Sequence, residues 1–368
     1  MKYARGLVVL LVALVVAPAR AGHEAPLYPS YYPQEIRIEA MGPDAAARQL
    51  ESSKIHAYLG REPRFAGPAP KSVRSVESLG SFRIARVNPL SPVAKDERAA
   101  CEAMGAVVAR SREAPGVVFH PYPVNGLHGD YLHHADLALL AKERWRVVLP
   151  PQPTGLKVWE ESPDTKEPVE WDVAAGDVEL ARLTAPHGFG ILGWQGPPWL
   201  KQGWFHAYLL LAPSLADPAV RAKTETLFAH LQAGTFATAA DRINAERELV
   251  SGLAAGCRTV VVGYAAKKDH YSAEYSEGIE NIAFDSHAGL NAPIFLRTVK
   301  LKDFPWNGWL RLGTAAPPAA AWNPLGGFSD EAGRLIWSAI SDPALFPEPY
   351  GAGWVLNRIG DVRAGSER

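Results

Sequence analysis

Six side chains able to bind a metal ion or move a proton lie close together in one segment of the chain. They are His120, His128, Asp130, His133, His134 and Asp136. If a helix begins at Asp130, that carboxylate and His134 are four residues apart and share one face of the helix. Imidazole and carboxylate groups are ligands that zinc, copper and iron take from proteins. The spacing therefore predicts a transition-metal site.

The same segment predicts further ligands and also has a simpler interpretation. His133 and Asp136 are three residues apart and share a second helix face, while His120 and His128 can complete the ligand set from the preceding loop. The segment follows a predicted strand, at the strand end where open α/β sheets place ligands. The alternative is that the aspartates cap a helix and the histidines are hydrogen-bonded core or surface groups.

A second polar cluster follows the apolar run at 259–264 and predicts a ligand-binding site. Its candidate residues are His270, Glu274, Asp285 and His287. A histidine that titrates near neutrality, oriented by a carboxylate, suits acid/base chemistry or a polar ligand shell. The alternative is a solvated acidic loop. If both clusters face one cleft, they form one site.

Trp306 is a further candidate for ligand binding, because it begins a group of tryptophans with Trp309 and Trp322. Indole rings stack on ligands or line apolar pockets. Such residues also pack loops, particularly where glycine and proline are interspersed.

A nucleotide cofactor is not expected. Residues 188–193 match the pattern G-x-G-x-x-G, but the sequence Trp-Gln-Gly-Pro-Pro that follows cannot form the helix that would receive a pyrophosphate. No P-loop and no H-E-x-x-H motif is present.

The N-terminus has the pattern of a secretory signal peptide. Lys2 and Arg5 precede an apolar run at 6–17, and Ala19-Arg20-Ala21 predicts cleavage before Gly22. The alternative is an uncleaved anchor helix, but a run of about a dozen residues is shorter than the roughly 20 that a bilayer core needs. We expect a mature protein, residues 22–368, in the periplasm or secreted, with no integral membrane segment.

Charge and cysteine content agree with this location and limit the partners. The whole chain carries a net charge of −1, and loss of three basic residues with the signal segment makes it −4. Basic residues are scattered, so no nucleic-acid partner is expected. Cys101 and Cys257 are the two cysteines, and in an oxidising compartment they could form one disulfide. Two separate buried thiols are the alternative.

Strand and helix patterns predict a mixed α/β fold. Strands at 35–39 and 56–60 flank a helix at 45–52, and strands at 81–87 and 116–120 flank a helix at 96–110, which favours parallel pairing. Residues 152–215, rich in Trp, Pro and Gly, predict strands and loops, including 205–211. The C-terminal part predicts helices at 219–231, 237–255 and 329–341, with strands at 259–264 and 294–300. The expected domains are 22–150 (α/β) and 151–368 (mixed α+β), sharing a cleft.

The opening strand–helix–strand, with Lys54-Ile55-His56-Ala57-Tyr58-Leu59-Gly60 after the helix, resembles the first lobe of periplasmic solute-binding proteins over about 30 residues. We expect an exported protein that binds a metal ion or small ligand in an interdomain cleft. The alternatives are a periplasmic metal-dependent hydrolase or oxidoreductase that uses the His/Asp cluster, and a structural subunit of an envelope complex with a protein partner.

Overall fold

The computed structural model describes residue 31 and residues 33–146, 155–161, 166–188, 199–306, 308–317, 330–341, 344–351 and 353–357. The predicted signal segment, its cleavage before Gly22 and most of the glycine motif at 188–193 lie outside these residues. Within the described part, no helix is both long enough and apolar enough to cross a membrane.

One mixed sheet organises the molecule, and it confirms the predicted α/β fold class. Its strand order is β1-β10-β2-β7-β3-β6-β5, and the short strand β4 also pairs with β7. The bounds are β1 Glu35–Ala40, β2 Ala57–Leu59, β3 Val73–Val87, β4 Val118–Phe119, β5 Val158–Glu160, β6 Val173–Glu179, β7 Thr259–Ser272 and β10 Trp309–Thr314.

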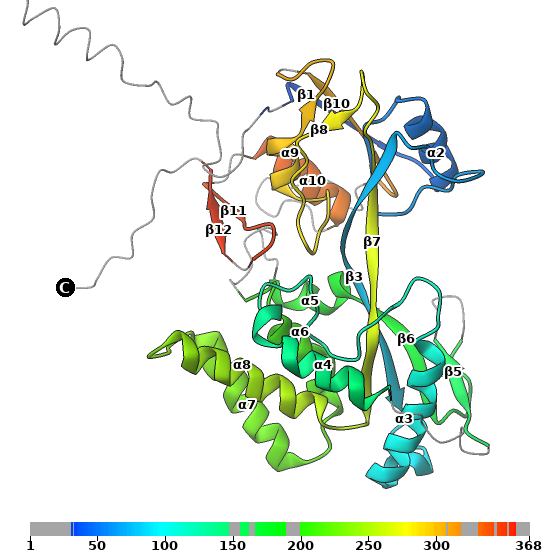
Figure 1. The fold of residues 1–368 in the computed structure, drawn as a ribbon, viewed down its shortest axis with the longest axis vertical. Helices are drawn as coiled ribbons and strands as arrows, with labels where there is room; N and C mark the ends of the chain where they lie inside the picture. The colour runs from blue at the N-terminus through cyan, green and yellow to red at the C-terminus, as the bar shows by residue number, and fades with distance from the viewer. Residues whose placement is uncertain are drawn as a thin grey trace, which may run out of the picture.

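Two long strands, β3 and β7, pair with each other along their lengths and connect two lobes (Figure 1). The upper lobe in Figure 1 contains β1, β2 and β10 with α2 Pro43–Glu51, α9 Pro293–Thr298, α10 Glu331–Ile340, β8 Ile279–Glu280, β9 Lys300–Leu301, β11 Leu345–Pro347 and β12 Trp354–Leu356. The lower lobe contains β4, β5 and β6 with α3 Glu97–Ser111, α4 Ala135–Arg144, α5 Leu180–Gly188, α6 Gly203–Leu211, α7 Pro218–Ala233 and α8 Ala239–Ala254.

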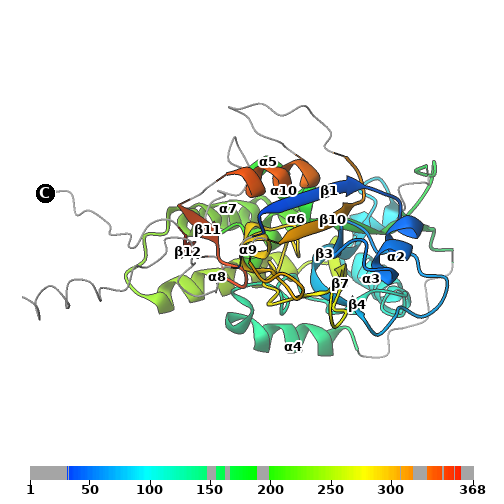
Figure 2. The same ribbon diagram turned by 90° about the horizontal axis from the view of Figure 1, so that it is seen from above.

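Alternation along β3 and β7 buries both faces of the sheet in the lower lobe. Phe82 and Val261 belong to the core beneath α6 and α8, whereas Ala85, Val260 and Val262 belong to the core beneath α3. Side chains of a strand point to opposite faces in turn, so one ribbon supports both layers of helices. Figure 2, seen from above, shows α4 and α10 on opposite sides of the sheet.

Three sequence predictions are corrected by the fold. Residues 205–211, predicted as a strand, belong to α6, and most of 294–300 forms α9. Strand β3 pairs antiparallel with β6 and β7, and β4 pairs antiparallel with β7. In contrast, β5 and β6 are parallel, and β1, β10 and β2 are parallel as the first unit predicts. The segment 205–211 was predicted as a strand because α6 is apolar almost all round, so its sequence shows no alternation of polar and apolar residues with a helical period.

The predicted division of the chain at residue 150 stays a prediction. Strands β1 to β4 lie before that position and β5, β6, β7 and β10 lie after it, and the two sets alternate in the sheet from β1 as far as β6.

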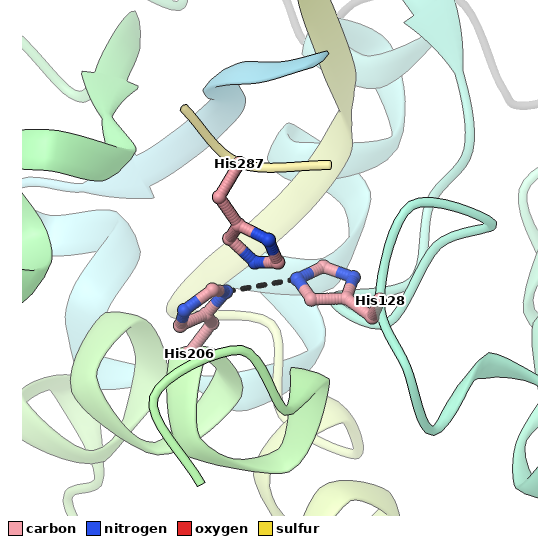
Figure 3. A group of neighbouring side chains, drawn as sticks. All are labelled: His128, His206 and His287. Carbon is pink, nitrogen blue, oxygen red and sulfur yellow. Dashed lines mark hydrogen bonds between the residues drawn. The ribbon is translucent and has the colours of Figure 1, made fainter. Parts of the chain in front are cut away.

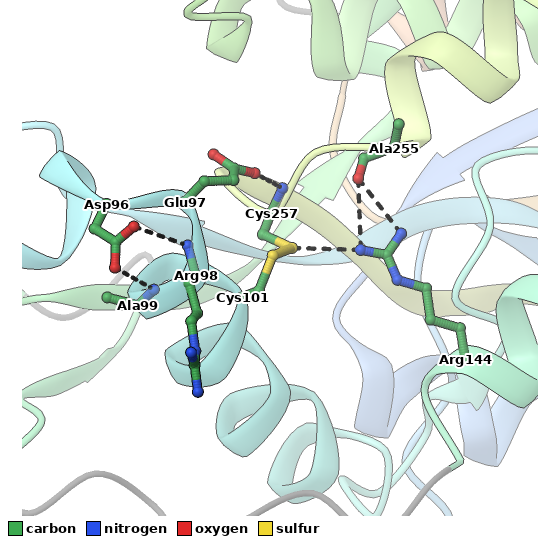
Figure 4. The surroundings of a disulfide bond; sticks show 8 residues. All are labelled: Asp96, Glu97, Arg98, Ala99, Cys101, Arg144, Ala255 and Cys257. Atoms are coloured by element: carbon green, nitrogen blue, oxygen red, sulfur yellow. Dashed lines mark hydrogen bonds between the residues drawn. A yellow bond between two sulfur atoms is a disulfide. The ribbon is translucent and has the colours of Figure 1, made fainter.

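A disulfide joins Cys101 of α3 to Cys257, which lies two residues before the start of β7, and confirms the pairing that the sequence left open (Figure 4). Its Cα atoms are 4.9 Å apart, and 156 positions separate the two residues. Asp96 caps α3 by accepting from the backbone N–H groups of Arg98 and Ala99, and the next residue, Glu97, accepts the N–H of Cys257 at 3.0 Å. The bond therefore holds α3 against the first residues of the long ribbon.

We expect the double variant Cys101→Ala/Cys257→Ala to lose about 2 to 5 kcal/mol of unfolding free energy, because the unfolded chain is no longer cross-linked across a long loop. Urea denaturation checks this. Reductant is expected to lower the stability of the wild type toward that of the variant and to leave the variant unchanged. Equal denaturation midpoints for the oxidised wild type and the variant would contradict the disulfide.

Candidate metal centre

Three histidines from three distant segments meet where the two lobes join. His128 lies in the loop after β4, His206 lies on α6, and His287 lies in a turn of the upper lobe (Figure 3). Their ring centroids are 4.9 Å (His128 to His206), 5.7 Å (His128 to His287) and 5.2 Å (His206 to His287) apart. The first two residues are buried, and His287 is partly buried with its Nε2 shielded from solvent. This group is named the histidine cluster below.

Hydrogen bonds define the protonation of two members of the cluster. The backbone N–H of Asn125 donates to His128 Nδ1 at 3.0 Å, so the proton of that neutral ring is on Nε2. His128 Nε2 then donates to His206 Nδ1 at 2.8 Å, and His206 Nε2 donates to the carbonyl of Leu200 at 2.8 Å. The two rings thus form a relay in which both carry Nε2–H.

The environment keeps all three imidazoles neutral. Burial lowers the pKa of His206 to about 4. Burial, together with repulsion from His206, lowers the pKa of His128 well below its usual value. The pKa of His287 is also well below its usual value, because of burial and repulsion from the two other histidines and Lys201. Neutral imidazole is the form that binds metal ions.

Asp130 positions His206 by holding the start of α6. Its two carboxylate oxygens accept the backbone N–H groups of Gly203 at 2.7 Å and Trp204 at 3.1 Å, which satisfies donors at the helix N-terminus. A Cβ at Gly203 would lie 2.5 Å from a methyl group of Val124, so the close approach of α6 to this loop requires glycine. Burial raises the pKa of Asp130 to about 6, against the lowering effect of the two N–H bonds.

His287 is positioned by a turn that is tied to both lobes. Asp285 accepts the backbone N–H groups of His287 at 2.8 Å and Ala288 at 3.0 Å, and it forms an ion pair with Lys201. Lys201, from the segment that leads into α6, also donates to the carbonyl of Glu348. The positive charge of Lys201, which acts on His287, is therefore paired with a carboxylate.

The six residues that were predicted to form one metal site do not lie together in the structure. His128 belongs to the histidine cluster, whereas Nε2 of His120 bonds the Val124 carbonyl at 2.8 Å. His133 Nδ1 is 2.9 Å from Glu246 Oε2. Asp136 is exposed and forms two 2.7 Å bonds with Arg247, which hold the pKa of that carboxyl well below its usual value. They do not converge on one point.

Asp130 and His134 do lie together, as their spacing predicts, although a short 3₁₀ turn and not an α-helix connects them. The Asp130 Oδ2 atom is 3.8 Å from His134 Nε2, and both side chains are buried. Burial lowers the pKa of His134 to about 4, and the neighbouring His133 and Arg247 contribute.

Of the two histidines predicted in the second polar segment, His287 belongs to the histidine cluster and His270 does not. His270 lies within β7, opposite Tyr58 and Ser75, and not in a loop after the strand. Glu274 accepts the backbone N–H groups of Ser276 and Glu277 and closes a surface turn. Trp306 is 60% exposed and packs on the ring of Tyr31. Thus Asp285 and His287 contribute to the junction, while the roles of the other three as ligand contacts stay predictions.

Sequence reasoning missed His206 and Glu246. His206 is the one histidine in the apolar run 203–211, and a lone histidine in such a run was the available signal. Glu246 lies three and four residues before Leu249 and Val250, which places it on the buried face of α8.

Comparisons with known proteins leave the family unassigned. No protein-family model and no curated protein matches the chain. Solved structures with a partial likeness include a nickel ABC transporter protein from Bacillus halodurans (12% identity, TM-score 0.36, 65% of this chain and 57% of that chain). HbpA2 from Haemophilus parasuis is 11% identical, with a TM-score of 0.41, over 71% of this chain and 57% of that chain. The periplasmic binding protein DppA from Helicobacter pylori is 10% identical, with a TM-score of 0.40, over 71% and 55%. The chain thus spans less than two thirds of the length of these proteins.

We expect nitrogen-detected NMR of the metal-free protein to show His128 and His206 as neutral Nε2–H tautomers at pH 7. On acidification His206 is expected to stay neutral until about pH 4. Because an unfolded histidine titrates near 6.5, the free energy of unfolding should fall between pH 6.5 and 4 by about 1.4 kcal/mol per pH unit for this residue. A protonated Nδ1 on His128 would show that the relay is absent.

Proposed function

We propose that the protein is an exported binding protein that holds a transition-metal ion at the histidine cluster, between its two lobes. One observation carries the proposal. Three imidazoles on a tetrahedral ion, with metal–nitrogen bonds of about 2.0 to 2.1 Å, have ring centroids about 5 Å apart. The centroids of His128, His206 and His287 are 4.9, 5.2 and 5.7 Å apart.

The hydrogen bonds around the cluster support two of the three ligands directly. His206 donates its Nε2 proton to the Leu200 carbonyl, so Nδ1 points into the cluster with its lone pair. This is the usual second contact of a metal-binding histidine. His287 Nδ1 bonds Ser286 Oγ at 3.0 Å, while Nε2 has no hydrogen-bond partner among the described residues.

His128 must change on binding. Its Nε2 carries the proton that is shared with His206, so a metal ion can bind there only by displacing it. The proton moves to Nδ1, which breaks the bond from Asn125. Metal binding at this atom is therefore coupled to a change of tautomer at His128 and to loss of the Asn125 contact, with no net release of a proton from a ring that is already neutral.

The ligand chemistry favours zinc, copper or iron, which accept neutral imidazole. A carrier or binding role is supported because the ligands come from both lobes and two of them are buried. A metal-dependent enzyme also needs an open coordination position that a substrate can reach, and burial of His128 and His206 offers no argument for one. Export is supported by the signal pattern and by the disulfide, which persists in oxidising compartments.

We expect the purified mature protein to bind zinc tightly, with X-ray absorption that indicates three imidazole ligands. His287→Ala should weaken zinc binding by roughly 100-fold or more, since loss of even a second-shell partner costs 10- to 100-fold. Calorimetry checks the affinity. At a zinc concentration 100 times the dissociation constant, the free energy of unfolding should rise by about 2.7 kcal/mol.

The matched control is His230→Ala. This residue lies on α7, away from the histidine cluster, and its Nε2 bonds a carbonyl of the adjacent turn. It should bind zinc as the wild type does. The proposed function would be wrong if the protein contained no bound ion and gained no thermal stability from zinc, copper or iron. Equal loss of zinc affinity in His287→Ala and His230→Ala would show that the metal does not bind at the histidine cluster.

A further inference from the structure

A second group of potential metal ligands lies in the lower lobe, apart from the histidine cluster. Asp130, His134 and Glu246 each offer one ligand atom, and these atoms all lie within 4.8 Å of one another. Their exposures are 1%, 0% and 0%. Two carboxylates and an imidazole are thus enclosed together in a setting where charge is costly unless it is compensated. This group is named the carboxylate cluster below.

His134 is the member whose hydrogen bonding is incomplete. Its Nδ1 is 3.2 Å from the hydroxyl of Tyr122, and its Nε2 has no hydrogen-bond partner among the described residues. Nε2 is directed toward Asp130 Oδ2, at 3.8 Å, which is too long for a hydrogen bond. When Nδ1–H donates to Tyr122, the Nε2 lone pair therefore faces a carboxylate. A cation between these two electron-rich atoms would compensate their repulsion in that tautomer.

The carboxylates retain capacity for a cation. Each oxygen of Asp130 accepts one backbone N–H group of α6 and has a second lone pair. Glu246 accepts from Arg242 through Oε1 at 2.9 Å and contacts His133 through Oε2 at 2.9 Å. Arg242 thus pairs with Glu246, and the arginine side chain is 40% exposed. Water around Arg242 weakens its compensation of the buried pair.

We propose that Asp130, His134 and Glu246 bind a divalent first-row metal ion, separate from the ion of the histidine cluster. Mixed oxygen and nitrogen ligands suit Mn²⁺, Fe²⁺ and Zn²⁺. Tyr122 contacts His134 Nδ1, and Arg242 and His133 orient the Glu246 carboxylate. Such outer contacts commonly surround metal ligands. The site depends on no ligand of the histidine cluster, so it can exist whether or not that cluster binds metal.

The test is an electron paramagnetic resonance titration of the metal-free mature protein with Mn²⁺, an ion that prefers oxygen-containing ligand sets to imidazole alone. We expect one bound Mn²⁺ per chain, with echo modulation from a single imidazole nitrogen. Glu246→Gln should weaken this binding by about tenfold or more. His287→Ala, which alters only the histidine cluster, should bind Mn²⁺ as the wild type does.

Each outcome decides the matter. No binding of Mn²⁺ by the wild type up to millimolar concentration, or modulation from three imidazoles, would overturn the carboxylate cluster as a site. Equal affinity in wild type and Glu246→Gln would also overturn it. The wild-type measurements decide even if Glu246→Gln does not fold. Failure of zinc to bind the histidine cluster, with Mn²⁺ binding intact, would overturn the proposed function alone.

Discussion

Antiparallel pairing of β3 with β7 is the constraint on which the site depends. The His287 turn is bonded to this ribbon, because Leu79 donates its backbone N–H to the Ser286 carbonyl and Asp269 accepts that of Leu290. The ribbon also determines where His128 lies, since β4 pairs with β7 just before the loop that contains it. At that pairing Gly263 approaches the carbonyl of Val118 so closely that a Cβ would lie 2.1 Å from its oxygen. A shift in ribbon register would separate the histidines.

Burial of polar groups gives the junction its specific geometry. A buried polar atom without a partner costs free energy, so most are paired, and the chain from Asn125 through His128 and His206 to Leu200 is such a case. The Nε2 atoms of His287 and His134 are the exceptions in the two clusters. Each of these two nitrogen atoms could bind a metal ion. Each also lies beside a side chain that hydrogen bonds hold in place, which is Asp130 for His134 and His206 for His287. The polar interior is therefore preorganised and not complete in itself.

The sequence predicted local features well and long-range ones poorly. Helices α2, α3, α7, α8 and α10 were predicted because each has a cap, a proline start or an apolar face that is visible within a few turns. The proximity of Asp130 and His134 followed from spacing alone. The pairing of β3 with β7 joins segments far apart in the chain, and no local pattern encodes it. His206 and Glu246 enter their clusters only through that tertiary arrangement, which is why neither was predicted.

The ribbon between the lobes is only two strands wide at its centre. Among the described strand pairs, β2 joins β7 near Tyr271 and β6 joins β3 from Ser81 onward, whereas Val76 to Leu79 pair with β7 alone, next to an irregularity at Gly80. Two-stranded ribbons twist more readily than wide sheets. A twist of this narrow part of the ribbon would displace the tips of the lobes more than His287, because the His287 turn is bonded to the ribbon itself. A metal ion bound at the histidine cluster, beside this ribbon, would therefore leave by exchange of its ligands and not by separation of the two lobes.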